Sequence, residues 1–159
     1  MDVCFTPIGI IRSPYPEPAG MPIQAVAAQG VAGQIELNPI YQTGLQDIEG
    51  FSHLILLYHL HLVHESSLLV TPFLDNQPHG IFATRSPKRP NPIGLSIVRL
   101  IRVEGATLHI EDVDIVDGTP LLDLKPYVST FDSREGAATG WFEQNAGRVY
   151  SVRADQRFL

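Results

Sequence analysis

The sequence predicts a mainly β protein, built as a single antiparallel β-barrel domain with short helices. Thirteen glycines and thirteen prolines divide the 159 residues into short segments, which favours strands over long helices. The apolar runs are brief and closely spaced, as they are in sheets that close fully or partly into a barrel. Long helices do not alternate with the strands and no G-x-G-x-x-G motif occurs, so a Rossmann sheet is excluded.

The first half of the chain predicts four strands and one helical turn. Residues 5–11 form a strand that stops before Ser13-Pro14, and further prolines predict an irregular stretch through residue 22. Residues 31–37 alternate weakly and predict a second strand, and residues 45–48 predict a helical turn. The run 51–63, FSHLILLYHLHLV, is rich in β-formers and predicts a buried strand, although a helix fits the same apolar run. Residues 68–74 predict a fourth, short strand.

The second half predicts a hairpin, two further strands and a short helix. Residues 95–103 and 107–116 flank Glu104-Gly105-Ala106, which reads as a hairpin turn. Asp117-Gly118-Thr119-Pro120 predicts a turn in which the proline stops strand pairing, and a strand follows at 121–124. A short helix is expected at 137–145 and a last strand at 148–153.

The composition is typical of a folded cytoplasmic protein. A hydrophobic content of 44% and a mean hydropathy of +0.05 fit a folded domain rather than a disordered chain. No run approaches the roughly 18 apolar residues of a membrane span, and the first residues lack the basic segment of a signal peptide. Cys4 is the single cysteine, so no intrachain disulfide can form and a reducing cytoplasm is expected.

The net charge of −6 hides two segments of opposite sign. Residues 80–102 hold five cations and no acid, whereas residues 103–123 hold six acids and no cation. An acidic protein is a poor non-specific ligand for nucleic acid, but a local basic segment can bind a few phosphates. The charge pattern therefore predicts a small nucleic-acid footprint at most.

The basic segment begins with an unusual loop, GIFATRSPKRPNPIGLS, at residues 80–96. Arg85, Lys88 and Arg89 stand among three prolines, which exclude the middle of a helix or of a central strand. A stiff loop has little conformational freedom to lose on binding, so it suits the fixed placement of an anionic or electron-rich ligand. The alternative is an ordinary solvated surface turn.

Other chemistry is weakly supported by the sequence. His59 and His61 could share one side of a strand, but no C-x-x-C or H-E-x-x-H motif occurs, so no metal site is expected. Cys4 lies in a predicted strand and no G-x-S-x-G motif occurs, which disfavours nucleophilic catalysis. Asp112 and Asp114 would share one face of a strand, either as a solvent-facing edge or as acceptors for ribose hydroxyls or a positive centre.

Four segments together resemble the signature of the TsaA-like family, which includes the TrmO-type tRNA N6-threonylcarbamoyladenosine methyltransferases. They are residues 8–15 (IGIIRSPY), 50–54 (GFSHL), 80–96 and 114–127 (DIVDGTPLLDLKPY). The resemblance covers about residues 5–130 in order and leaves 131–159 as an extension of one domain, residues 1–159. Bacterial members often carry an additional C-terminal domain, for which this chain leaves no room.

The resemblance implies a methyltransferase that uses S-adenosyl-L-methionine on a β-barrel and forms a homodimer, with the cofactor near the subunit interface. The expected cofactor contacts are Ser13, Pro14, Tyr15, Ser52, His53, Lys88, Asp112, Val113 and Asp114. The expected catalytic and positioning residues are His53, Arg85, Arg89 and Asn91.

The implied substrate is tRNA, methylated on N6 of threonylcarbamoyladenosine next to the anticodon. A general base would assist this weak nucleophile, and the candidates are His53, Asp112, Asp114 and Asp117. Arg85 or Arg89 could bind the threonyl carboxylate through a bidentate pair.

Aromatic side chains offer stacking surfaces for the unpaired bases of an anticodon loop. Tyr15, Tyr127 and Phe82 are the candidates, although each fits a place in the core equally well. Two other classes of function stay open at this point: a regulatory or interaction module that binds the cofactor without methylating tRNA, and a metal hydrolase.

Overall fold

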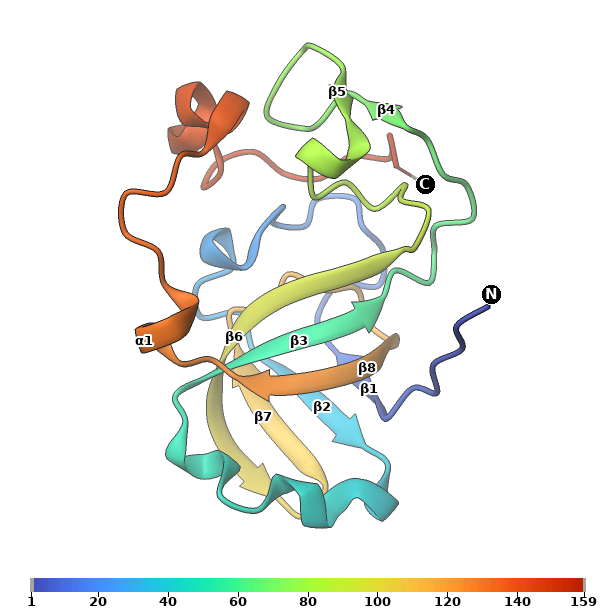
Figure 1. The fold of residues 1–159 in the computed structure, drawn as a ribbon. Helices are drawn as coiled ribbons and strands as arrows, with labels where there is room; N and C mark the ends of the chain where they lie inside the picture. The colour runs from blue at the N-terminus through green and yellow to red at the C-terminus, as the bar shows by residue number, and fades with distance from the viewer. Residues whose placement is uncertain (1, 159) are drawn as a thin grey trace.

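The structure is a computed structural model that describes residues 2–158. Six antiparallel strands close into a barrel in the order β1-β2-β7-β6-β3-β8, which confirms the predicted fold class (Figure 1). The barrel strands are β1 (Gly9–Arg12), β2 (Gly33–Leu37), β3 (His53–His59), β6 (Ile93–Glu104), β7 (Thr107–Glu111) and β8 (Thr119–Pro126). The pairing of β1 with β8 closes the barrel.

A smaller layer lies above the barrel in Figure 1. It contains the two-stranded sheet of β4 (Leu69–Val70) and β5 (His79–Gly80), the turn η4 (Ile81–Ala83) and the 3-10 helix η5 (Gly140–Arg148). Two further 3-10 helices, η2 (Pro39–Leu45) and η3 (Ile48–Gly50), lie at the opposite end of the barrel, and α1 (Ser129–Asp132) follows β8. The loop after β1, which includes η1 (Ala25–Ala27), runs between the barrel and the upper layer.

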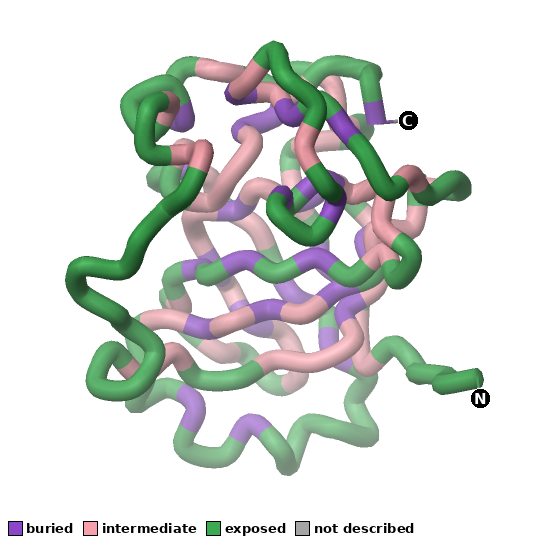
Figure 2. The backbone as a smooth tube through the Cα atoms, turned by 45° about the horizontal axis from the view of Figure 1, so that its top comes forward, coloured by how far each residue is buried: buried purple, intermediate pink, exposed green. Residues whose placement is uncertain are grey.

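The core fills the barrel, because alternate residues of each strand point inward. Buried and exposed positions alternate along the strands in Figure 2. The inward residues are almost all aliphatic, which is the pattern expected of a small barrel filled by side chains. The fully buried ones include Ile11, Ile35, Leu54, Leu56, Val98, Leu108, Ile110 and Leu121. A separate cluster of Val70, Ile81 and Phe158 holds the upper layer together.

Several predicted elements are confirmed with different bounds. The run 51–63 contributes β3, so the alternative helix is wrong. The hairpin around Gly105 is confirmed, with Glu104 paired to Thr107 and Gly105 in the left-handed region at φ +62°. The 80–96 loop is shorter than predicted, because β6 begins at Ile93 and residues 93–96 are strand.

Prolines and one positive φ explain most of the shifted strand ends. The first strand begins at Gly9 instead of residue 5, and Pro7 lacks the N–H that pairing would need. Strand β7 stops at Glu111 instead of residue 116, because Asp112 takes a left-handed φ of 69°. The strand predicted at 68–74 pairs only at Leu69–Val70.

Pro120 does not stop pairing as predicted. It lies inside β8, which runs over Thr119–Pro126 instead of 121–124. Pro120 pairs with Ile10 of β1 and precedes the Tyr58–Leu121 pair that ends the β3 ladder, so no β3 carbonyl needs its missing N–H.

The helical predictions hold in type but not in place. The turn expected at 45–48 is divided between η2 and η3, and the helix expected at 137–145 is η5. The strand predicted at 148–153 is wrong. Ser151 and Val152 donate to the carbonyl of Arg148 in a continued helical turn, and Arg153 alone pairs, with Pro22.

Candidate functional site

Three loops meet between the barrel and the upper layer: residues 13–30 after β1, residues 81–92 before β6 and residues 112–118 after β7. Ser13 joins the first and third loops, since its N–H donates to Asp117 Oδ1 at 3.0 Å and its hydroxyl donates to the carbonyl of Ile115 at 2.5 Å. The N–H of Asp117 returns a bond to the carbonyl of Tyr15 at 2.7 Å. The loop that carries Ser13, Pro14 and Tyr15 is therefore fixed against the acidic loop, and the binding of the cofactor by these residues stays a prediction.

Arg85 connects the loop 81–92 to the other two. Its Nη1 donates to Gln24 Oε1 at 3.0 Å, and its charge acts on the carboxylate of Asp114. Ala25, next to Gln24, bonds to Asp114 through its backbone N–H. Neither residue was predicted as a site residue, because both lie in an irregular stretch without a recognisable chemical motif. The two segments of opposite charge therefore lie near enough for the charge of Arg85 to act on Asp114, without an ion pair between these two groups among the described residues.

Arg89 holds its own loop in shape. Its Nη1 lies within hydrogen-bonding distance of three backbone carbonyls, at 2.8 Å from Thr84, 3.3 Å from Ile81 and 3.3 Å from Ser86. The Thr84 hydroxyl adds a bond to the carbonyl of Ile81 at 2.9 Å. These contacts give Arg89 a structural role in fixing the loop, and its contact with a substrate stays a prediction.

The remaining predicted residues of this loop lie near its end. Lys88 is half-buried and its carbonyl accepts the N–H of Ser67 at 3.1 Å. Its side chain lines a hollow of about 290 Å³ together with residues of the upper layer. Asn91 is exposed directly before β6. The hydroxyl of Ser86 is buried without a hydrogen-bond partner, alone in this respect among the described residues.

Asp114 is the end of a hydrogen-bonded row inside the site. Ser96 Oγ donates to Asp114 Oδ1 at 2.6 Å, and Tyr58 Oη lies 2.9 Å from Ser96 Oγ. Burial raises the pKa of Asp114 to about 6, against the lowering effects of Ser96, of Arg85 and of the backbone. Burial, and then the charge of Asp114, raise the pKa of Tyr58.

Gly94 makes room for this row. A Cβ at residue 94 would lie 2.1 Å from Cε2 of the Tyr58 ring, so no side chain fits there without displacing the tyrosine. Ser96 and Gly94 belong to the 80–96 segment of the family signature, but no role in the site was predicted for either. Tyr58 was not predicted because it lies in the apolar run 51–63. Their alternating positions on β3 and β6 were the only available signal.

The prediction that Asp112 and Asp114 share one strand face is wrong. The left-handed backbone at Asp112 turns the chain after β7, so the two carboxylates meet different groups. Asp112 Oδ1 accepts the N–H of Gly30 at 2.8 Å, whereas Asp114 meets Ser96. Val113, between them, is completely buried against the core.

Ser52 and His53 lie apart from Asp114 within this chain. They stand at the start of β3, with Ser52 Oγ at 2.9 Å from His53 Nδ1, and the His53 ring meets Tyr127 edge-on at 6.3 Å. Tyr58 is five residues further along the same strand, a separation of about 16 Å. A different hollow, of about 380 Å³, lies on the outer surface beside Ser13 and Pro14.

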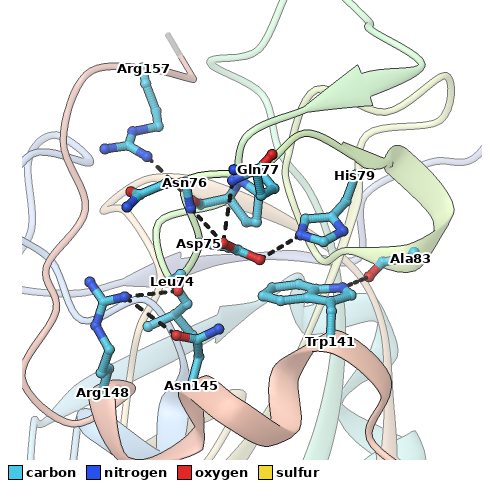
Figure 3. A network of polar contacts seen from close by, with 11 residues as sticks. Leu74, Asp75, Asn76, Gln77, His79, Ala83, Trp141, Asn145, Arg148 and Arg157 are labelled. Carbon is cyan, nitrogen blue, oxygen red and sulfur yellow. Dashed lines mark hydrogen bonds and ion pairs between the residues drawn. The ribbon is translucent and has the colours of Figure 1, made fainter.

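The C-terminal segment supports η4 from outside the barrel (Figure 3). Trp141 Nε1 donates to the carbonyl of Ala83 at 2.8 Å, and its indole stacks on His79 with 4.5 Å between ring centroids. His79 Nε2 lies 2.8 Å from Asp75 Oδ2, a bond that lowers the pKa of Asp75. These contacts fix the turn that precedes Arg85, and no sequence motif pointed to them.

Metal ligands do not gather in the part of the chain that the structure describes. Residues 2–158 contain no group of three or more His, Cys, Asp or Glu side chains placed to hold an ion.

Comparisons with known proteins agree with one another. The family model of the tRNA-methyltransferase O N-terminal domain matches residues 10–133. A Pyrococcus abyssi protein, named as a probable S-adenosyl-L-methionine-binding protein, is 53% identical over 157 residues, covering 99% of this chain and 85% of that protein. A mouse tRNA (adenine(37)-N6)-methyltransferase is 37% identical over 136 residues, covering 80% of this chain and 31% of the mouse protein.

Solved structures carry the same fold. The crystal structure of TrmO from Pseudomonas aeruginosa matches with a TM-score of 0.75 and 36% identity, covering 89% of this chain and 63% of that one. The chain therefore spans about a third of the mouse relative and less than two thirds of the Pseudomonas structure.

Proposed function

This chain belongs to the family of the tRNA-methyltransferase O N-terminal domain, and we propose that it transfers a methyl group from S-adenosyl-L-methionine to tRNA. The proposed acceptor is N6 of threonylcarbamoyladenosine next to the anticodon. The observation that carries this proposal is the joining of the loops by the bonds of Ser13 to Asp117 and of Arg85 to Gln24, with the charge of Arg85 close enough to lower the pKa of Asp114. Such a site offers a negative group for a positively charged cofactor and a positive group for an anionic acceptor.

The residues present fit the cofactor on two counts. The Ser86 hydroxyl is buried and unpartnered among the described residues, so it has hydrogen-bonding capacity to spare. The Asp112, Asp114 and Asp117 carboxylates place negative charge along one loop, which suits a molecule that supplies a methyl group on a positively charged sulfur. We assign Ser13, Pro14, Tyr15, Lys88, Asp112, Val113 and Asp114 of one chain to its binding.

Arg85 is the residue best placed to recognise the acceptor. The threonyl carboxylate of threonylcarbamoyladenosine is anionic, and Arg85 offers an exposed guanidinium that can form a bidentate pair with such a group. Arg89 supports Arg85 indirectly, because it donates to the carbonyls of the loop that presents Arg85 and Asn91. Fixing the reacting groups in this way can lower a bimolecular barrier by about 7–11 kcal/mol at best.

An exposed aromatic side chain next to Arg85 offers a stacking surface for anticodon bases. Phe82 is 75% exposed, although it stands on η4, a turn fixed by Arg89 and by Trp141. A large apolar ring held rigidly in solvent is typical of single-stranded nucleic-acid contacts. We place the bases flanking the acceptor on Phe82, with Tyr15 and Tyr127 as further candidates.

We also propose that two copies of the chain form the working enzyme. The outer face of β6 exposes Ile93, Leu95, Ile97 and Ile101 by 39–47%, and it lies beside Ile55 and Leu57 of β3. This apolar surface, the β3–β6 face, suits a second copy of the same chain. His53 lies on the same outward side of β3 as Ile55 and Leu57, and we propose that in the dimer His53 and Ser52 contribute to the site of the other subunit.

The remaining proposals concern the extent of the domain and its compartment. We treat the segment after residue 130 as part of the same domain, because Trp141 and Arg148 bond to carbonyls of the upper layer. No helix in residues 2–158 is long and apolar enough to cross a membrane. We propose the cytoplasm as the place of action, where tRNA is modified.

Labelled cofactor and two pools of tRNA test the function. The protein should label tRNA that carries threonylcarbamoyladenosine and leave tRNA from cells without that modification unlabelled. Label in neither pool would contradict the tRNA methyltransferase. Cofactor binding in the absence of any labelling would favour the alternative, a cofactor-binding module, which the name of the Pyrococcus relative makes a specific second candidate.

A further inference from the structure

The three polar groups of the row in the site have a fixed direction. An ionised Asp114 can only accept, so the Ser96 hydroxyl gives it its single proton over 2.6 Å. The Ser96 oxygen must then accept the proton of Tyr58 over 2.9 Å, since it has no second proton to offer. The row therefore runs from Tyr58 through Ser96 to Asp114, and its negative end faces the three loops.

Three elements near Asp114 each contribute a group that stabilises its charge, besides the backbone of Asp114 itself. Strand β6 supplies Ser96, the loop 81–92 supplies Arg85 and η1 supplies the backbone N–H of Ala25, and all three lower the pKa of Asp114. Burial outweighs them and leaves the pKa at about 6. Asp114 is thus ionised at neutral pH and still basic enough to accept a proton, which is the balance that general bases require.

The other three candidate bases are Asp112, Asp117 and His53, and their contacts differ from those of Asp114. Asp112 accepts the N–H of Gly30, and Asp117 accepts the N–H of Ser13 and lies 3.9 Å from Arg12. His53 stands at the far end of β3, beside Ser52. Of the four, Asp114 alone combines partial burial, the influence of the Arg85 charge and a second hydroxyl behind its hydrogen-bond donor.

We propose that Asp114 is the proton acceptor of the methyl-transfer step and that Ser96 and Tyr58 are its positioning residues. This inference rests on the proposed function. The acceptor nitrogen gains the methyl carbon, the sulfur keeps the electron pair of the broken bond, and the N–H proton becomes the O–H proton of Asp114. Release of that proton to water restores the carboxylate.

Three substitutions and two controls test the row. Asp114→Asn removes the proton acceptor, Ser96→Ala removes its donor, and Tyr58→Phe removes the outer hydroxyl but keeps the ring beside Gly94. Asp132→Asn and Ser151→Ala are matched controls on the exposed surface. Three quantities are measured: the single-turnover rate from roughly pH 5 to 9, the cofactor affinity by calorimetry, and the ¹³C carboxyl resonance of Asp114 in the cofactor-free protein.

The expected results differ among the variants. Asp114→Asn should lose on the order of 10²–10⁴-fold in rate, and the loss should persist at a saturating concentration of cofactor, so that weaker cofactor binding does not account for it. Ser96→Ala should keep most of the rate at high pH, but its acid limb should move to higher pH because the carboxylate loses a stabilising donor. Tyr58→Phe should shift the limb in the same direction by a smaller amount, and the controls should follow the unmodified protein.

The inference is overturned if Asp114→Asn methylates at a near-normal rate, or if Ser96→Ala leaves the acid limb in place. A protein that methylates no tRNA at all would contradict the proposed function instead. The carboxyl resonance still decides the row in that event, since an Asp114 midpoint unmoved by Ser96→Ala would exclude the positioning role.

Discussion

Replacing Asp114 by Asn should stabilise the protein at neutral pH. Burial raises the pKa of Asp114 from its ordinary value of 3.8 to about 6, so the folded protein resists the charge that the unfolded chain accepts freely. Each tenfold change in an acid dissociation constant is about 1.4 kcal/mol, so this rise corresponds to about 3 kcal/mol. The value is an upper one, because the side chain is not completely buried and solvent screens part of the charge.

The pH dependence determines in which direction the stability difference between the two proteins should change. Below about pH 4 the carboxyl is protonated in both states, and the charge costs nothing. Between about pH 4 and 6 the unfolded chain loses its proton first, so this group's cost to the native state grows and is complete above pH 6. The stability advantage of Asp114→Asn should therefore grow by up to about 3 kcal/mol across that window.

Urea denaturation from about pH 4 to 8 measures this difference directly, with Asp132→Asn as a control for the loss of one negative charge. Asn keeps the size of Asp and can accept the Ser96 hydroxyl through its amide oxygen, so the neutral contacts are largely preserved. A difference between the two proteins that stays constant over the whole pH range would refute the reasoning.

The remaining predictions concern packing, RNA contact and assembly. Gly94→Ala should destabilise the protein by about 1–3 kcal/mol in urea denaturation, because its Cβ would lie 2.1 Å from the Tyr58 ring; an unchanged midpoint would contradict the packing. Phe82→Ala should weaken tRNA binding by about 1–3 kcal/mol in a filter assay, whereas the exposed Phe131→Ala should have no effect; equal losses would exclude stacking at Phe82. Leu95→Glu should convert a dimer to monomers in light-scattering chromatography, and a dimer that survives it would exclude the β3–β6 face.

The barrel could be predicted because the residue pattern of each strand can be seen within that strand alone. Alternating aliphatic residues and the turns between them define β2, β3, β6 and β7 without reference to the rest of the chain. The ends of the strands were harder to predict, because each depends on the backbone conformation or the pairing of a single residue. The left-handed φ of Asp112 ends β7, and Pro120 is tolerated in β8 only because the β3 ladder ends beside it.

The candidate site was predictable in its segments and not in its internal roles. The four motifs named Ser13, Arg85 and Asp114 on segments that lie near one another in the structure, although Asp114 was expected in a strand and lies in the loop after β7. The row of Tyr58, Ser96 and Asp114 joins a strand, another strand and a loop, so the alternation within each strand could show which way Tyr58 and Ser96 face but not that they meet Asp114. An arginine that binds a ligand and one that binds loop carbonyls also look alike in a sequence, which is why the role of Arg89 needed the structure.

The support of η4 by the C-terminal segment has a consequence for the order of assembly during synthesis. The last barrel strand ends at Pro126, so the barrel can close once that residue has left the ribosome. The turn η4, which presents Arg85, is completed later, because Trp141 and Phe158 supply its outer contacts. The binding loop is therefore complete only after residues 141–158 have been made, and a chain truncated before Trp141 should fold without a fixed η4.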